Sequence, residues 1–530
     1  MIYMRGTTKV WCKQCRLKDM VLAAGVLLLT CQPLLADDWV IGSPTTLTDV
    51  STMQGANVSF EMGQQWDEDT YMILYRMGTL TVDASATTTW NIGKFTLPVD
   101  FYNYDSNYFE ERTENIFRIG SLVNLRTPIH ANSIEAVLAD QGYMDWTFFS
   151  VPFDVNMSDI NPHGKEQWVV RRYDGQLRAE AKGGQTWVDV QDNEMLHANQ
   201  GYIIMRDYSN FDYDNWDELA GFFTLPAADT ENKQRMFSSG DITIDLQYYE
   251  AKRAHNADWN FVGNPYPCYF RLGDIEEQAI ITIYDEKELC YRSYSTLDDA
   301  DNILKPMGAF FVQATNIGRL TFRASGRQAD YTEIEIMDWN DDWGADYAPH
   351  RAMASDRIVL NITLTDGHHE DRTRLVVNNE ASRNYEANRD ACKFMSNRKG
   401  IPQIFTLEGD VSYAINERPV DNETIALGYV AGEGGQHTLH LQDCQTAIML
   451  TDHLTGTTTD LSQGDYIFEA TSGTDTTRFT LTIGQTTSLQ QPDAPHSDGS
   501  NSYYNIKGQQ VSQPANRGIY INQSHKAIVR

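Results

Sequence analysis

Residues 258–266 read DWNFVGNPY, and residues 145–153, which lie 113 positions earlier, read DWTFFSVPF. Each stretch has a phenylalanine two positions after its tryptophan, Trp146 or Trp259. Because successive side chains of a strand point to opposite faces, this spacing places both rings on the same face, and we expect that face to be buried. A proline follows and ends the pairing, since it has no N–H to donate to a neighbouring strand. The two stretches therefore predict two equivalent buried β-strands.

Further matching segments follow in the same order, and their spacing shifts as it would if loops had changed length. They are Ser158-Asp159-Ile160 with Gly273-Asp274-Ile275, Arg172-Tyr173-Asp174 with Ile283-Tyr284-Asp285, and Gly201 to Ile204 with Gly308 to Phe311. We interpret them as two copies of one β-module, at residues 141–235 and 254–330. The expected repeat core contains Trp146, Pro152, Trp259 and Pro265. An exposed aromatic platform for sugar rings is the alternative, but the alternation favours a core.

The segments around the modules also have the character of β structure. Residues 37–140 contain short β-prone runs separated by Gly, Asn and Asp, and predict an N-terminal β domain. Residues 331–350 form a polar, acidic connector. From 351 to 484, alternating runs such as Ile358 to Leu364, followed by the turn Asp366-Gly367, predict a β-sandwich. Residues 485–500, rich in Ser, Thr, Gln, Pro and Asp, read as a linker. The expected fold class is all-β and multidomain, with tandem β-modules, a β-sandwich and a small C-terminal β unit.

The first 36 residues have the order of a secretory signal peptide. Five basic residues precede an apolar run from Met20 to Leu29, and the small residue Ala36 marks the expected cleavage site. The apolar run is too short for a transmembrane anchor, which needs roughly 20 residues. A lipoprotein signal is the alternative, because Leu28-Leu29-Thr30-Cys31 loosely resembles a lipobox. We expect an exported protein without a membrane span.

Charge and length limit the partners and the domain count. The formal net charge is −31, which repels phosphate backbones and argues against nucleic acid as a partner. A chain of 530 residues exceeds one core and suggests three or more domains. Cys268, Cys290, Cys392 and Cys444 remain after the leader. Bridges between the first two and the last two are open, because four cysteines permit three connectivities.

The last thirty residues contain three short alternating strands: Tyr503 to Val511, Arg517 to Ile521 and His525 to Arg530. They resemble the C-terminal sorting domain of type IX secretion cargo, a small β unit that outer-membrane secretion machinery recognises. The residues that carry the resemblance are Gly508, Val511, Gly518, Ile519, Tyr520 and Lys526. The resemblance implies that residues 501–530 are a sorting domain, and that the protein is secreted or displayed on the outer-membrane cell surface. A plain final hairpin of the sandwich is the alternative.

The repeat itself also resembles modules of large, uncharacterised bacterial surface proteins. In those proteins a segment similar to Trp259 to Tyr266 is common. The resemblance implies surface display and names no reaction.

Few residues suggest a metal or a cofactor. Asp338, Asn340 and Asp342 alternate as calcium ligands do, but Trp343 stands where the turn requires glycine, so calcium is only a weak expectation. His368 and His369 are adjacent, which on a strand directs them to opposite faces, and a solvated hairpin loop is the better interpretation. No other cofactor is expected.

No catalytic motif is present. The chain lacks Gly-x-Ser-x-Gly, His-Glu-x-x-His, the Walker pattern and Gly-x-Gly-x-x-Gly. The sequence favours a non-catalytic binding, adhesive or structural surface protein with a glycan or host-matrix ligand. The alternative is a secreted, glycosidase-like hydrolase that uses loop carboxylates, since such a pair needs only a set separation across a cleft. The acids considered for it are Asp298, Asp299, Asp301, Glu276 and Glu277.

Overall fold

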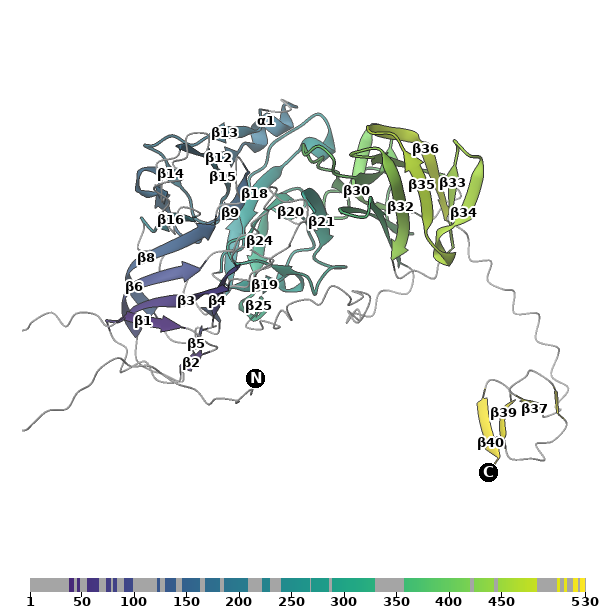
Figure 1. Ribbon diagram of the computed structural model, residues 1–530, viewed down its shortest axis with the longest axis horizontal. Coiled ribbons are helices and arrows are strands. Elements are labelled where there is room, and N and C mark those ends of the chain that lie inside the picture. Colours follow the sequence, from purple (N-terminus) through teal and green to yellow (C-terminus); the bar gives the residue numbers. More distant parts are fainter. Residues whose placement is uncertain are drawn as a thin grey trace, which may run out of the picture.

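Nearly all regular structure in the computed structural model of the chain is β-strand (Figure 1). The structure describes residues 38–41, 45–47, 55–65, 73–77, 80–82, 90–98, 122–123, 129–139, 145–162, 167–181, 185–207, 222–228, 240–266, 268–285, 288–328, 357–419, 424–442, 447–483, 503–505, 510–511, 518–522 and 525–529. Within these ranges α1 (Gly175–Ala179) is the single α-helix. The predicted all-β, multidomain fold is confirmed. No helix of the described ranges has the length and apolar character needed to cross a membrane.

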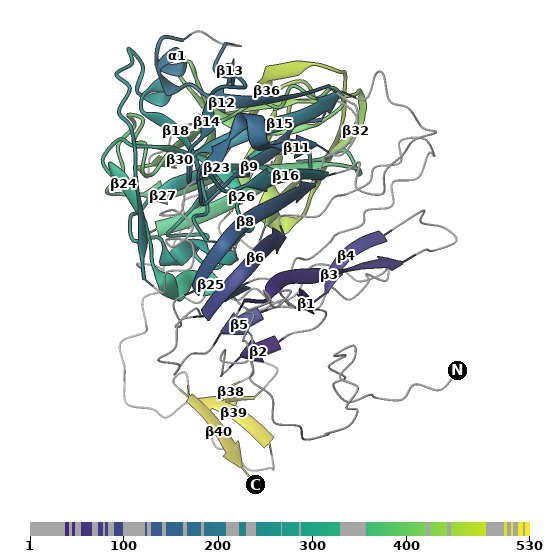
Figure 2. The same cartoon turned by 90° about the vertical axis from the view of Figure 1, so that its left-hand side faces the viewer.

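A seven-stranded sheet joins the N-terminal region to the first module. Its strands are β1 (Asp38–Ile41), β3 (Asn57–Gln65), β4 (Ile73–Met77), β6 (Trp90–Pro98), β8 (Ile129–Ala139), β11 (Asn161–Pro162) and β16 (Phe222–Pro226). Figures 1 and 2 show β6 and β8 side by side, and these two strands pair in parallel. A small parallel sheet beside it consists of β2 (Thr45–Leu47), β5 (Leu80–Val82) and β7 (Leu122–Val123). The predicted N-terminal β domain therefore shares a sheet with strands of the first module.

Each module contains one four-stranded antiparallel sheet, with the same strand order in both. The first runs β9 (Thr147–Ser150), β15 (Gly201–Asp207), β12 (Gln167–Tyr173), β13 (Trp187–Asp189) across the sheet. The second runs β18 (Trp259–Gly263), β23 (Ala309–Gln313), β20 (Ile280–Asp285), β21 (Cys290–Ser295). In both, the fourth strand along the chain pairs with the first.

Smaller elements match as well. The ribbon of β10 (Val155–Asn156) with β14 (Met195–Leu196) corresponds to that of β19 (Tyr269–Arg271) with β22 (Ile303–Leu304). The 3-10 turn η2 (Met157–Asp159) corresponds to η5 (Leu272–Asp274). Strand β17 (Ile242–Asp245) pairs with β24 (Arg319–Phe322) as β8 pairs with β16. The shared order thus begins at β8 and β17, ahead of the starts at 141 and 254 predicted from sequence, and the domain boundaries themselves stay predictions.

The pairing register corrects one alignment made from sequence. Gly201 lies opposite Ser150, and Ala309, not Gly308, lies opposite Gly263. The closing strands are therefore equivalent with a shift of one residue relative to the alignment of Gly201 with Gly308. Sequence alone favoured the glycines because they match in type, whereas the sheet matches positions by hydrogen bonding.

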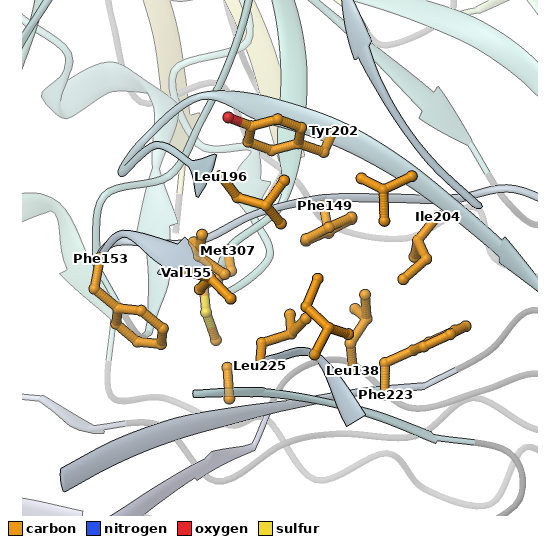
Figure 3. Packing of buried hydrophobic residues seen from close by; sticks show 14 of the residues in the cluster. Leu138, Phe149, Phe153, Val155, Leu196, Tyr202, Ile204, Phe223, Leu225 and Met307 are labelled. Atoms are coloured by element: carbon orange, nitrogen blue, oxygen red, sulfur yellow. The ribbon is translucent and has the colours of Figure 1, made fainter. Parts of the chain in front are cut away.

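The outer face of each module sheet packs on the strand pair beside it. Figure 3 shows the first of these cores, where Phe149 and Tyr202 of the module sheet meet Leu138 of β8 and Phe223 of β16. Met307, from the second module, is part of the same cluster. In the second module the corresponding core joins β20 and β23 to β17 and β24.

The C-terminal β-domain contains one eleven-stranded sheet. Its strands are β26 (Arg357–Thr365), β27 (Glu370–Asn378), β28 (Ala391–Cys392), β29 (Gln403–Glu408), β30 (Val411–Arg418), β31 (Ile425–Val430), β32 (Gly435–Gln442), β33 (Ile448–Asp452), β34 (Thr457–Asp460), β35 (Tyr466–Ala470) and β36 (Thr474–Ile483). β26 and β27 form the hairpin predicted around Asp366-Gly367. Side chains from nearly the whole sheet meet in one core. The expected sandwich is thus a single sheet that curls around its core, because hydrogen bonds continue between strands that sequence alone assigns to no layer.

The last four strands form a separate antiparallel sheet in the order β38-β37-β39-β40 (Figure 1). Its strands are β37 (Tyr503–Asn505), β38 (Gln510–Val511), β39 (Gly518–Asn522) and β40 (His525–Val529). Of the predicted sorting residues, Val511 lies in β38, the triplet from Gly518 to Tyr520 in β39, and Lys526 in β40. Gly508 lies outside the described residues. The three strands expected from sequence are four.

Candidate ligand pocket at a domain junction

The predicted repeat-core residues are buried to different extents. Trp259 is 2% exposed, and its indole N–H donates to the carbonyl of His255 at 2.8 Å. Trp146 is half-buried just before β9, and the guanidinium of Arg171 lies 4.8 Å from its ring centre. The prolines that follow the two strands, Pro152 and Pro265, are both buried.

The inner faces of the two module sheets meet across aromatic rings. Phe148 stacks on Tyr284 with ring centres 4.7 Å apart, and it meets Phe261 edge to face at 6.1 Å. Trp187 meets Phe261 at 5.5 Å, also edge to face. Such geometries add to the stabilisation that burial of the rings provides. The modules are therefore joined by a continuous aromatic core.

Equivalent backbone groups exchange hydrogen bonds between the modules. The N–H of Ser150 donates to the carbonyl of Met307 at 2.8 Å, and the N–H of Gly263 donates to the carbonyl of Asn199 at 3.1 Å. Asn199 and Met307 hold equivalent positions before the closing strands, and both have a positive φ, 63° and 53°. This reciprocity is typical of an interface with a twofold relation.

A segment of the C-terminal β-domain, residues 385–398, inserts into the aromatic core. The ring of Phe394 lies 4.7 Å from Trp259 and 5.0 Å from Phe311. The hydroxyl of Tyr385 donates to the side-chain oxygen of Gln313 at 2.5 Å. We call this segment the strap, and it joins the C-terminal β-domain to both modules through buried contacts.

The strongest candidates for a hydrolytic acid pair are held in ion pairs instead. Asp298 accepts a hydrogen bond from Arg357 at 2.9 Å, and Asp299 accepts two from Arg374 at 2.5 and 2.6 Å. Burial alone would raise the pKa of Asp299, but the charge and hydrogen bonds of Arg374 outweigh burial and lower it. Both acids are buried. They join the second module to the C-terminal β-domain.

The other acids considered for catalysis lie apart from that junction. Glu277 accepts from the N–H of Thr321 at 2.6 Å, and Glu276 lies 3.9 Å from Arg323. Asp301 is exposed. Their contacts describe structural carboxylates and solvated surface.

Three thiols are free and buried: Cys268, Cys290 and Cys392. The bridge between Cys268 and Cys290 that the sequence left open is therefore absent, since the two lie in different cores. Burial raises the pKa of the Cys268 thiol to about 12 and also raises that of Cys290, so neither is a reactive thiolate. Cys444 lies outside the described residues.

The candidate metal ligands are not brought together. Asp338, Asn340 and Asp342 lie outside the described residues. The backbone N–H groups of His368 and His369 both donate to Asp366 in the hairpin turn. The part of the chain that the structure describes contains no group of three or more His, Cys, Asp or Glu side chains arranged to hold a metal ion.

A pocket of about 350 Å³ lies where the second module meets the C-terminal β-domain. Its walls are mostly aliphatic, and its polar groups are an arginine, a tyrosine and an asparagine. The lining residues are Leu272, Ile281, Ile283, Tyr294, Asn302, Ile303, Leu304 and Arg372. All except Arg372 belong to the second module; Arg372 lies on β27. Apolar pockets with a few polar groups at domain junctions are common ligand sites.

Arg372 is placed by packing within the junction. Its guanidinium lies 5.0 Å from the ring centre of Tyr294 and donates to the carbonyl of Ser293 at 3.1 Å. Burial, and next the charge of Arg374, lower the pKa of Arg372. Unlike Arg374, Arg372 has no carboxylate within 4.0 Å among the described residues. The pocket therefore has an uncompensated positive charge at its wall.

Sequence reasoning did not identify this pocket. Arg372 and Arg374 alternate with Leu375 and Val377 on one strand, which indicates that the two arginines share a face opposite the core of the C-terminal β-domain. What covers that face comes from residues 281–304, and no local pattern reports it. The alternation was the available signal, and it gives the side of the strand without the neighbour.

Together the fold and the junction define a multidomain all-β protein in which two similar modules and a C-terminal β-domain share buried interfaces. A family model described as a domain of unknown function (DUF8693) matches residues 281–483. The match begins inside β20 and ends with β36, so it includes both sides of the ion-paired junction and most of the pocket. No curated protein and no solved structure matches the chain.

Proposed function

We propose that this chain is a non-catalytic secreted or cell-surface protein, exported by a type IX-like route, that serves as a binding, adhesive or structural module toward glycan or host matrix. The observation that carries the proposal is the use of Asp298 and Asp299. Both are bound by arginines inside a domain junction, where a general acid or a nucleophile would have no access to substrate. A binding module has no need of a free acid pair.

The joined build supports the same proposal. Aromatic packing, ion pairs and the strap hold the modules and the C-terminal β-domain together. A protein that bridges a cell surface and a ligand benefits from such connections, because load on one domain is passed to the next. Display at the surface is an expectation from the leader and from residues 501–530.

Turnover assays test the non-catalytic proposal. The purified protein is incubated with a broad panel of glycans and peptides, and we expect binding to some members without release of products. Turnover that a single carboxylate substitution abolishes would establish the hydrolase instead.

Deletion of residues 501–530 tests the address. We expect the shortened protein to remain in the periplasm of its own host, while the full chain reaches the surface. Surface labelling with an antibody distinguishes the two, and undiminished labelling of the shortened chain would refute the sorting role.

A further inference from the structure

We infer that the pocket at the junction binds a small organic acid, with an apolar body between Ile283, Ile303 and Leu304 and a carboxylate on Arg372. The inference rests on the proposed function as a binding protein, and it adds a site and a ligand class. The shared chemistry of the ligand is one carboxylate attached to one apolar group. A free acid and the C-terminal residue of a peptide both have it.

The charge balance of the junction points to an anion. The chain has 73 acidic and 42 basic residues, and the neighbouring arginines each have an acid: Arg292 lies 3.2 Å from Asp285, and Arg374 lies 2.5 Å from Asp299. Arg372 has a carbonyl and a ring as partners and no carboxylate within 4.0 Å in the described ranges. A carboxylate from a ligand would complete this set, since guanidinium groups bind carboxylates through paired N–H donors.

The shape and chemistry of the walls point to an apolar body. Ile303 is 51% exposed at the rim, which is unusual for a large aliphatic side chain unless a ligand or partner covers it. Leu304 and Ile281 are buried behind it. The volume of about 350 Å³ lies at the lower end of small-molecule sites. A sugar would need more hydrogen-bonding groups than this wall offers.

The polar groups at the wall set the orientation. The described contacts include no hydrogen bond from the hydroxyl of Tyr294 or from the side-chain amide of Asn302, and both residues line the pocket. Arg372 lies over the Tyr294 ring, so the carboxylate is expected beside that ring, with the apolar body directed toward Ile303.

The test uses the full chain and matched acid and amide probes. The probes are 4-methylpentanoate with 4-methylpentanamide, and the tripeptide Gly-Gly-Leu with its C-terminal amide. Binding is measured by ligand-observed NMR and by titration calorimetry. We expect both acids to bind and both amides to bind at least about tenfold more weakly, since a hydrogen-bonded charge pair is lost. Tighter binding of the tripeptide acid identifies a peptide C-terminus as the source, and tighter binding of 4-methylpentanoate identifies a free acid.

Variants separate the pocket from the rest of the surface. Arg372→Gln is expected to weaken acid binding at least about tenfold, and Arg319→Gln, which removes an exposed arginine of the same module, is expected to leave it unchanged. Ile303→Trp fills the rim at a half-exposed position and is expected to abolish binding of acids and amides alike, even if Arg372→Gln fails to fold.

Equal affinity for acid and amide, unchanged binding by Arg372→Gln or Ile303→Trp, or no binding of any probe at millimolar concentration would overturn the inference. These results leave the proposed function in place. Cleavage of the tripeptide would instead refute the non-catalytic function.

Discussion

Asp452 shows how one side chain stabilises the C-terminal β-domain. It is fully buried and accepts hydrogen bonds from Arg478, from the Tyr466 hydroxyl at 2.8 Å and from the N–H of Leu454 at 2.8 Å. These contacts join β33, β35 and β36, the strands at which the curled sheet approaches its own edge. A buried carboxylate is tolerated here because each of its oxygens has a donor.

Substituting Asp452→Asn is predicted to destabilise the protein by at least about 2 kcal/mol at pH 7. Burial alone would raise the pKa of Asp452, but the bonds from Arg478 and Tyr466 outweigh burial and lower it to about 2. A lowered pKa gives stability that is present above the unfolded value near 4 and is lost as pH falls toward 2. Thermal unfolding between pH 7 and pH 2 measures the effect.

The control is Asp465→Asn, a half-exposed acid paired with His440, for which little change is expected. A gap between Asp452→Asn and the wild type that stays constant from pH 7 to pH 2 would contradict the assignment.

At Gly201 the limit is space and not charge. A Cβ there would overlap the ring of Phe261, whereas the equivalent position in the second module is Ala309. We predict that Gly201→Ala lowers stability by about 1–3 kcal/mol through overpacking. The matched change Ala309→Gly should cost no more than about 1 kcal/mol. Calorimetric melting compares the two, and equal losses would contradict the packing argument.

At the scale of the element, β27 connects two domains because its faces differ. Leu375 and Val377 enter the core of the C-terminal β-domain, while Arg372 and Arg374 face the second module. One strand thus supplies a hydrophobic core on one side, and on the other side an ion pair and the charge of the pocket.

Breaking the pair of Arg374 with Asp299 is predicted to cost about 3–5 kcal/mol, because the remaining charge is buried without its partner. The double variant Arg374→Gln with Asp299→Asn should lose less than the sum of the single variants. Chemical denaturation of the four proteins gives the coupling. The exposed pair of Arg171 with Asp189 is the control, where Arg171→Gln should cost less than about 1 kcal/mol. Additive losses at Arg374 and Asp299 would contradict the assignment.

At the scale of the whole molecule, the strap and the junction make the domains depend on one another. Phe394 of the strap contacts Trp259 and Phe311, and the buried pair of Lys393 with Asp371 fixes the base of the strap. An interface with a continuous apolar core behaves as part of one folded unit.

A protease site inserted after Met337, in the expected acidic connector, tests this dependence. We predict that the two fragments stay together after cleavage and elute as one species in gel filtration under native conditions. They should separate only in denaturant. Separation in native buffer would show that the junction is weak. Adding Phe394→Ala to the cut protein removes a ring from the aromatic core and should favour separation.

The sequence by itself determined the all-β class, the strand alternation and the β26–β27 hairpin, because side-chain period and turn residues are local properties of the chain. It also identified the aromatic stretches of both modules. Only the tertiary structure decided that Arg374 meets Asp299, that Arg372 meets no acid in the described residues, that Cys268 and Cys290 remain free, and that the expected sandwich is one curled sheet. These outcomes depend on which strands become neighbours over long sequence separations. An alternating pattern specifies a buried face, but it does not specify what covers that face.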